Sequence, residues 1–136
     1  MRWSPEYSIG IPELDREHEE LFRHFDRLIE AIAGRHDGTG ALEIIHFLDD
    51  YIHNHFMREE KLMHTFHFPE GELHKGQHRY FKGVFYRLRE EIEKNGAHQF
   101  DELQLAKLLT TWWTNHIMNL DRKLGSYLES QPGWTT

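Results

Sequence analysis

Histidines and a carboxylate stand in this sequence at spacings that suit a metal site. His55 and Glu59 are four residues apart, as are His74 and His78. In an α-helix this spacing places two side chains on the same face, about 6 Å apart along the axis. Each pair could therefore grip one ion, and the carboxylate of Glu59 could reach between two ions.

Three further residues complete the candidate set. His18 lies early in the chain, and His116 and Asp121 lie late, five residues apart. On an ideal helix a five-residue gap points two side chains ~140° apart. If both bind at one site, the helix must widen between them, as helices do at some functional sites. The predicted metal ligands are His18, His55, Glu59, His74, His78, His116 and Asp121.

Four long amphipathic segments must position these ligands. The breaks between them are GRHDGTG (34–40), HTFHFPEG (64–71) and KNGAHQF (94–100). We expect helices at about 12–33, 40–63, 69–95 and 100–128, after a non-helical arm at 1–11 that packs on them through Trp3, Tyr7 and Ile9. Short connections between long helices predict an all-α, up-down-up-down four-helix bundle, with residues 1–136 forming a single domain.

Each predicted helix carries an apolar stripe that is interrupted by polar residues at one level. Because neighbouring helices run in opposite directions, ligands early in the first and third helices meet ligands late in the second and fourth. Burying so many polar groups without partners would cost several kcal/mol, about 1–3 kcal/mol for each group. A shared metal centre satisfies them together. The apolar positions of the stripes include Leu14, Leu21, Phe25, Leu28, Ile44, Leu48, Ile52, Phe81, Phe85, Leu105, Leu109 and Trp112.

Other histidines have suggestive spacings but do not fit the same site. His46 and Asp50 are four residues apart, yet His46 is nine residues from His55 and therefore faces the opposite side of the helix. The acid-x-x-His form recurs at Glu43–His46 and Asp50–His53, but both copies lie on one helix, whereas di-iron carboxylate bundles place them on two. We expect surface positions for His24, His36, His46, His64, His67 and His98.

The overall composition narrows the class of protein. The formal net charge is −7, which argues against nucleic acid or an anionic membrane as a partner. The absence of cysteine excludes disulfides and thiolate metal sites. The N-terminus does not resemble a signal peptide, and no apolar run approaches the roughly 20 residues that span a bilayer, so we expect a cytoplasmic protein.

Imidazole and carboxylate without sulfur suit iron, manganese or zinc. Five histidines and two carboxylates are too many ligands for one ion. With the two carboxylates bridging and one oxide or hydroxide bridge, they fill all but one position of two octahedral ions. A single open position in an apolar pocket suits a small uncharged molecule, and dioxygen is the natural candidate for ferrous iron.

The stretches IGIPELDREHEELF, HFMREEKLM, HKGQHRYF and WWTNHIMNLD together resemble the hemerythrin family, in particular the single-domain bacteriohemerythrins. The resemblance implies an oxo- or hydroxo-bridged pair of iron ions in each chain. His74, His78 and His116 would fill one iron, and His18 and His55 would hold the other and leave it open to dioxygen. Glu59 and Asp121 would bridge the pair.

Two residues depart from the family pattern. Glu17 stands where family members usually carry glutamine, and we expect it to face solvent. Trp113 stands where the family commonly has a leucine that lines the oxygen pocket. Either Trp113 turns outward and Trp112 keeps the core position, or Trp113 faces the pocket, narrows it and offers its N–H as a hydrogen-bond donor.

The leading hypothesis is thus a non-heme di-iron protein that binds oxygen reversibly for storage, delivery or sensing, and not an enzyme. An open di-iron site could also carry out peroxidase or oxidase chemistry, although no acid–base residue points to a substrate. An oxygen- or iron-responsive signalling module that acts on a separate protein partner is a third hypothesis. A structural zinc site fits poorly, because four ligands would suffice.

Overall fold

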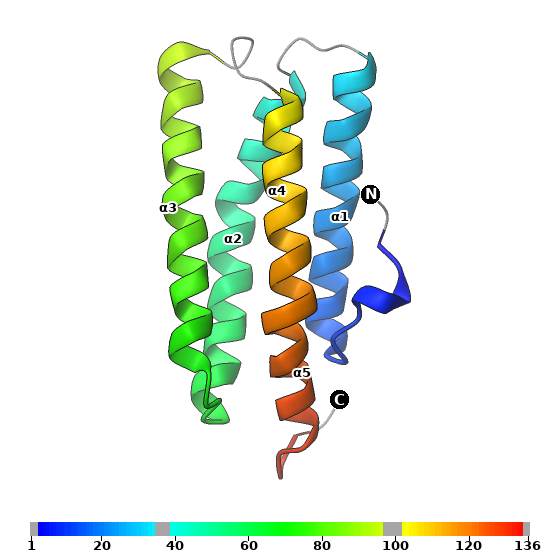
Figure 1. The fold of residues 1–136 in the computed structure, drawn as a ribbon, viewed down its shortest axis with the longest axis vertical. Helices are drawn as coiled ribbons and strands as arrows, with labels where there is room; N and C mark the ends of the chain where they lie inside the picture. Colours follow the sequence, from blue (N-terminus) through cyan, green and yellow to red (C-terminus); the bar gives the residue numbers. More distant parts are fainter. Residues whose placement is uncertain (1–2, 35–38, 97–101, 135–136) are drawn as a thin grey trace.

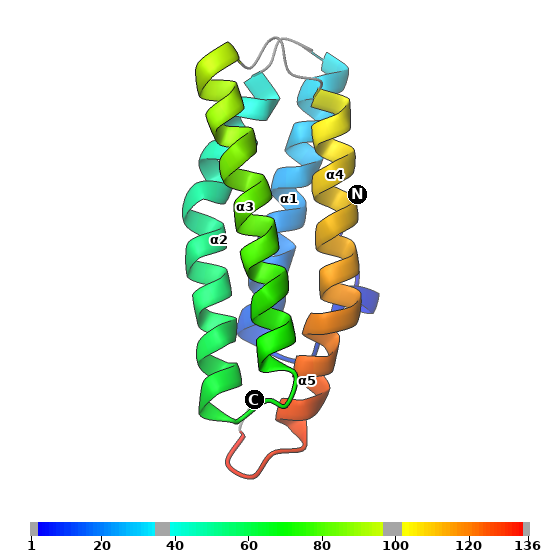
Figure 2. The same ribbon diagram turned by 60° about the vertical axis from the view of Figure 1, so that its left-hand side comes forward.

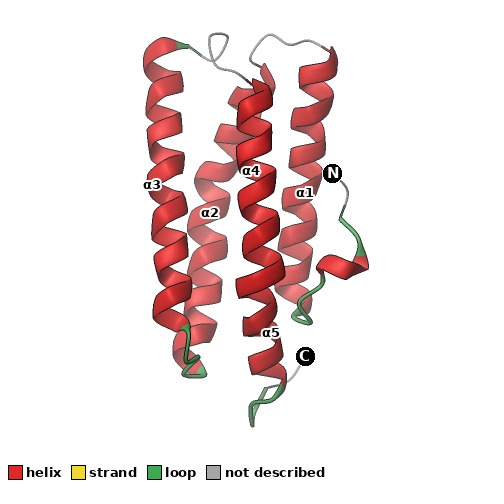
Figure 3. Ribbon diagram, viewed as in Figure 1, coloured by secondary structure: helices red, strands yellow, loops and turns green. Residues whose placement is uncertain are grey.

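Long antiparallel helices form most of the described structure, a computed structural model that describes residues 3–34, 39–96 and 102–134. Helices α1 (Pro12–Gly34), α2 (Thr39–Thr65), α3 (Gly71–Asn95) and α4 (Glu102–His116) alternate in direction, and no strand occurs in the described ranges. Figures 1 and 3 show them side by side, and Figure 2 shows the same bundle turned by 60°. The predicted all-α, up-down-up-down bundle is confirmed.

The last predicted helix is interrupted by a turn of a different helix type. After His116 the backbone opens into a π-helical turn, Ile117–Asp121, and then resumes as α5, Arg122–Glu129. The third helix begins at Gly71, two residues after the expected start at Pro69. It ends where Gly96, at φ 85°, takes a conformation that favours glycine, and its N–H donates to the Ile92 carbonyl.

The core consists of the apolar stripes of all the helices. α1 packs against both α2 and α4, and α2 also packs against α3. Phe25, Leu48, Ile52 and Phe85 are among the fully buried side chains, as the spacing predicts. Within the described residues, no helix combines the length and the apolar character that crossing a bilayer requires.

The predicted apolar stripe of α4 is wrong at one position, because it contains Trp112. Trp113 is completely buried, whereas Trp112 is only partly buried and packs at the edge of the core. Adjacent helical residues point about 100° apart, so one tryptophan excludes the other from the centre. The local spacing admits either residue, and packing against the other helices selects Trp113.

Glu102 joins the beginnings of α4 and α2. Its side chain is buried, and its Oε2 accepts a hydrogen bond of 3.0 Å from the backbone N–H of Ala41. A carboxylate at a helix N-terminus satisfies an otherwise unpaired N–H and interacts favourably with the helix dipole. This contact fixes α2 against α4 at the end of the bundle where α2 begins.

The N-terminal arm packs on α1 and α5 (Figures 1 and 2). It is not wholly extended, because Pro5–Tyr7 form a 3-10 turn. Asp15, in the first turn of α1, accepts hydrogen bonds from the Ser8 hydroxyl (2.6 Å) and the Ile9 N–H (2.8 Å). Ile9 itself is buried against the bundle.

Gly125 on α5 allows the arm to approach closely. A Cβ atom at this position would lie 1.8 Å from the Ile9 carbonyl oxygen. We therefore expect Gly125→Ala to displace the arm and to lower the free energy of unfolding by about 1–3 kcal/mol.

Gly83→Ala is the matched control, because Gly83 is exposed and no atom lies within 4 Å of its Cβ position. The control should raise stability by about 0.5–1 kcal/mol. Urea denaturation of the metal-free protein measures both, and equal stabilisation by the two variants would contradict the close contact.

Candidate metal centre

All seven predicted ligands converge in the interior of the bundle. Each side chain is buried, with an exposed fraction of at most 4 %. The donor atoms fall into two groups, in each of which the atoms lie within 4.8 Å of one another. One group is Glu59, His74, His78, His116 and Asp121; the other is His18, His55, Glu59 and Asp121.

The two carboxylates belong to both groups, and each divides its oxygens between them. Glu59 Oε2 lies 3.0 Å from the Nε2 of His55, whereas Glu59 Oε1 lies 3.0 Å from the Nε2 of His78. Asp121 follows the same pattern, with Oδ2 at 3.2 Å from His18 Nε2 and Oδ1 at 2.9 Å from His74 Nε2. A carboxylate with one oxygen toward each of two positions is arranged to bridge two ions.

The π-helical turn brings His116 and Asp121 to the same site. A regular helix would point residues five apart in different directions. The extra residue in the π turn removes this difference, and Asp121 Oδ1 lies 3.1 Å from His116 Nε2. π-Helical turns occur frequently at functional sites, where they redirect a side chain. The wide turn that the spacing required is therefore present.

Metal ions would satisfy the nitrogen and oxygen atoms of the cluster better than hydrogen bonds among these atoms can. The Nε2 atoms of His18 and His55 lie 3.1 Å apart, and those of His78 and His116 lie 3.2 Å apart. A pair of imidazole nitrogens can share only one proton in a hydrogen bond. Both Asp121 oxygens and Glu59 Oε2 are buried, and each lies 2.9–3.2 Å from a histidine nitrogen, so each contact needs a proton or a cation between the two atoms. Metal ions between these atoms would satisfy all of them, and nitrogen and oxygen donors without sulfur suit iron, manganese or zinc.

In the metal-free protein, the pKa values of several cluster residues differ strongly from their ordinary values. Burial opposes the charged form of His55, but the charges of Glu59 and Glu17 outweigh burial and raise its pKa to about 10. Burial is likewise outweighed at His74, where Asp121 and Glu59 raise the pKa to about 10. The pKa of the Glu59 carboxyl is held well below its usual value, because the neighbouring histidines outweigh the effect of its burial.

Several aromatic side chains lie beside the cluster. Trp113 lies with its ring centroid 5.9 Å from that of His55 and 5.4 Å from that of Phe56. Its Nε1 is buried, and no described residue forms a hydrogen bond with it. Tyr51 stacks on His55 at 5.1 Å. Of the two orientations that the sequence left open for Trp113, the inward one is present.

The expectation that Glu17 faces solvent is wrong. Its side chain is only 14 % exposed, and its Oε1 lies 2.7 Å from His55 Nδ1. Its other oxygen forms an ion pair with Arg58. Glu60 holds His78 in the same way, at 2.8 Å from Nδ1. The periodicity places Glu17 at the edge of the buried stripe, three residues after Leu14, where it can face either the core or solvent.

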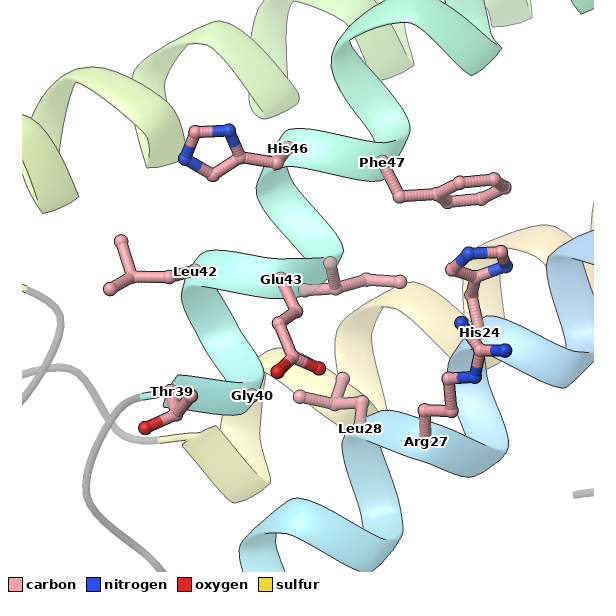
Figure 4. Close-up of a pocket in the computed structure, with 10 residues that line it drawn as sticks. His24, Arg27, Leu28, Thr39, Gly40, Leu42, Glu43, His46 and Phe47 are labelled. Atoms are coloured by element: carbon pink, nitrogen blue, oxygen red, sulfur yellow. The ribbon is translucent and has the colours of Figure 1, made fainter.

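The remaining histidines in the described residues lie outside the cluster. His46, His53, His64 and His67 are exposed, and His36 and His98 are outside the described residues. His24 is half-buried and stacks on Phe47, with ring centroids 3.5 Å apart. A pocket of about 570 Å³ lies between α1 and the beginning of α2. Figure 4 shows that His24 and His46 lie on different sides of this pocket, so they do not converge on an ion.

Comparisons with known proteins give one family. The family model described as "Hemerythrin HHE cation binding domain" matches residues 9–128. Bacteriohemerythrin of Pseudomonas aeruginosa (strain UCBPP-PA14) is 32 % identical over 121 residues, which cover 88 % of this chain and 75 % of that protein. Bacteriohemerythrin of Clostridium acetobutylicum is 27 % identical and covers 89 % of this chain and 95 % of its own.

Solved structures of hemerythrin share the fold. The wild-type protein and a leucine-to-tyrosine variant each superpose with a TM-score of 0.79 at 24 % sequence identity. Each match covers 96 % of this chain and 98 % of the solved chain. The bundle therefore matches those structures over almost its entire length.

The shifted pKa values predict how the stability of the metal-free protein depends on pH. A histidine with a raised pKa stabilises the fold fully below its ordinary value of 6.5, and this contribution is lost as the pH rises through about 10. Glu59, with a lowered pKa, contributes above its ordinary value of 4.5 and less as the pH falls below it.

We therefore expect the free energy of unfolding to be greatest between pH 4.5 and 6.5 and to fall toward pH 10. Urea denaturation of metal-free protein at a series of pH values measures it. The variant His46→Gln, which changes an exposed histidine, should leave the profile unaltered. Stability that stays constant from pH 6.5 to 10 would contradict the charged pairs.

Proposed function

Because this chain belongs to the hemerythrin family, we propose that it holds two iron ions at the buried cluster and binds dioxygen reversibly. The buried histidines and carboxylates suit a di-iron site, and oxygen binding fits them. The observation that carries the proposal is the divided orientation of the two carboxylates. Glu59 and Asp121 each present one oxygen to either group of histidines.

The two groups differ in the number of nitrogen donors. We infer that His74, His78 and His116 would hold one ion, with Glu59 and Asp121 shared between both. The other ion would then have only two nitrogen ligands, His18 and His55, which leaves it one ligand short. When bound, ferrous iron at this position supplies the electrons and the open coordination position with which dioxygen combines.

The protein contributes ligation and a dry, closed environment. Trp113, Phe56 and Ile52 are all completely buried, and Trp113 and Phe56 lie beside His55. An apolar shell around a metal site controls the access of solvent and thereby the redox behaviour of the metal. The buried carboxylates and imidazoles near the cluster have roles as ligands or as partners of ligands. This arrangement favours reversible binding of a small gas over catalysis on a larger substrate.

Iron stoichiometry and reversibility test the proposal. Metal-free protein is loaded with ferrous iron without air, the bound iron is counted, and oxygen is then admitted and removed. We expect two irons per chain and an absorption band that forms with oxygen and disappears on degassing. His74→Ala should lower the iron content, whereas His46→Ala, at an exposed histidine, should retain two irons.

One iron per chain, or none, would contradict the proposed di-iron centre. Two irons with oxidation that degassing does not reverse would contradict oxygen carriage and would favour peroxidase or oxidase chemistry. A reversible response that changes the binding of a protein partner would instead assign the oxygen-binding site to signalling. Acid should bleach the band, because imidazole ligands must be neutral to bind metal.

Trp113 is proposed to line the oxygen pocket and to exclude water from it. Trp113→Leu would leave space for water beside His55, so we expect the oxygen-dependent band to decay several-fold faster. Trp113→Phe keeps an aromatic ring but removes the indole N–H. It therefore distinguishes the effect of the aromatic bulk from the effect of the N–H on the lifetime of the band. An unchanged lifetime in Trp113→Leu, measured by stopped-flow or conventional absorption, would show that Trp113 does not line the pocket.

A further inference from the structure

The five histidines of the cluster differ in the hydrogen-bond partner of Nδ1, the ring nitrogen that faces away from the centre of the cluster. Two histidines have a carboxylate at Nδ1: His55 pairs with Glu17, and His78 pairs with Glu60. In the other three, the Nδ1 atom is buried and has no hydrogen-bond partner among the described residues: His18, His74 and His116. Each of the two donor groups thus contains one carboxylate-paired imidazole, His55 in one and His78 in the other.

Glu17 is held in place from several directions. Its Oε1 lies 2.7 Å from His55 Nδ1, and its Oε2 forms an ion pair with Arg58. The Tyr51 hydroxyl donates a hydrogen bond of 2.8 Å to the Glu17 backbone carbonyl. Tyr51 also stacks on the His55 ring. The carboxylate and the imidazole are therefore fixed relative to one another by α1 and α2 together.

Glu60 performs the same task across a different helix pair. It follows Glu59 directly on α2, but Glu59 turns into the core while Glu60 reaches α3. Its Oε2 lies 2.8 Å from His78 Nδ1, and its side chain is 29 % exposed. Phe56 stacks on the face of the His78 ring, with ring centroids 3.8 Å apart. Both paired imidazoles therefore have a restricted orientation.

A carboxylate at Nδ1 has two effects on an imidazole. It accepts the Nδ1 proton, so the lone pair is confined to Nε2, which faces the cluster in both residues. Its negative charge also strengthens the ring as a metal ligand. The three unpaired histidines receive neither effect.

We propose that Glu17 and Glu60 are positioning residues that set the tautomer and the donor strength of one imidazole each. Glu17 acts on His55 and thereby on the ion with two histidines, and Glu60 acts on His78 and the ion with three. This inference rests on the proposed function only in requiring that the two donor groups hold metal ions.

The test uses Zn²⁺, which is diamagnetic and reports binding without oxygen chemistry. In the zinc-loaded protein, proton NMR should show two imidazole N–H resonances shifted downfield by carboxylate partners. Glu17→Gln, which keeps size but removes charge, should move one resonance, and Glu60→Gln should move the other. Zinc competition with a chelating dye should show about tenfold weaker binding of one ion in each variant. Glu19→Gln, at an exposed glutamate on α1, is the matched control and should change neither.

Arg58 provides an independent variant that does not touch a ligand. Its side chain is 41 % exposed, so replacement by glutamine should be tolerated. Arg58→Gln frees Glu17 from its ion pair and should strengthen its bond to His55. The same resonance should then move downfield, opposite to its movement in Glu17→Gln.

Several outcomes would overturn the inference. Resonances that stay unchanged in Glu17→Gln, or that move together in both glutamine variants, would show that neither carboxylate acts on a single imidazole. Equal loss of both zinc ions in Glu17→Gln would indicate a general structural role. Wild-type protein that binds fewer than two zinc ions would contradict this inference and the di-iron proposal together. The predicted shifts without any reversible oxygen band would support the inference while contradicting the proposed function.

Discussion

The burial of two carboxylates among five imidazoles is the constraint on which the rest of this structure depends. Glu59 and Asp121 have no exposed surface, and an isolated buried carboxylate is strongly unfavourable. The structure offsets this cost by surrounding both residues with histidine nitrogens at about hydrogen-bonding distance. In the metal-free protein these contacts require protons, and metal ions would replace those protons. The same donor atoms can therefore be satisfied by protons in one state and by metal ions in the other.

This constraint explains why the helices are regular almost everywhere and irregular at one place. A four-residue spacing aligns His55 with Glu59 and His74 with His78 without any distortion. Asp121 can join them only because α4 opens into a π turn after His116. α5 then continues to Gly125, where the N-terminal arm packs closely. Tyr127, two residues later, donates from its hydroxyl to the Phe66 carbonyl in the turn between α2 and α3. The arm and this turn therefore both hold α5, the helix that follows the distorted segment.

Glu17 and Trp113 determine much of the environment of His55. Glu17 places a full negative charge beside His55, and Trp113 places the largest side chain beside the same ring. Both lie at the donor group that has fewer histidines. The charge favours a strong nitrogen donor, and the bulk leaves little room for water.

The sequence by itself determined the helices and the identity of the seven converging residues, because helical periodicity places residues three and four apart on one face. It also required a distortion between His116 and Asp121, since their spacing fits no regular helix facing one site. It did not determine which of Trp112 and Trp113 turns inward, or that Glu17 contacts His55. Both depend on the rotation of one helix against others, and residues at the edge of a stripe become buried or exposed with a small rotation. Only the packed bundle decides such positions, because the partner that covers them comes from a distant part of the chain.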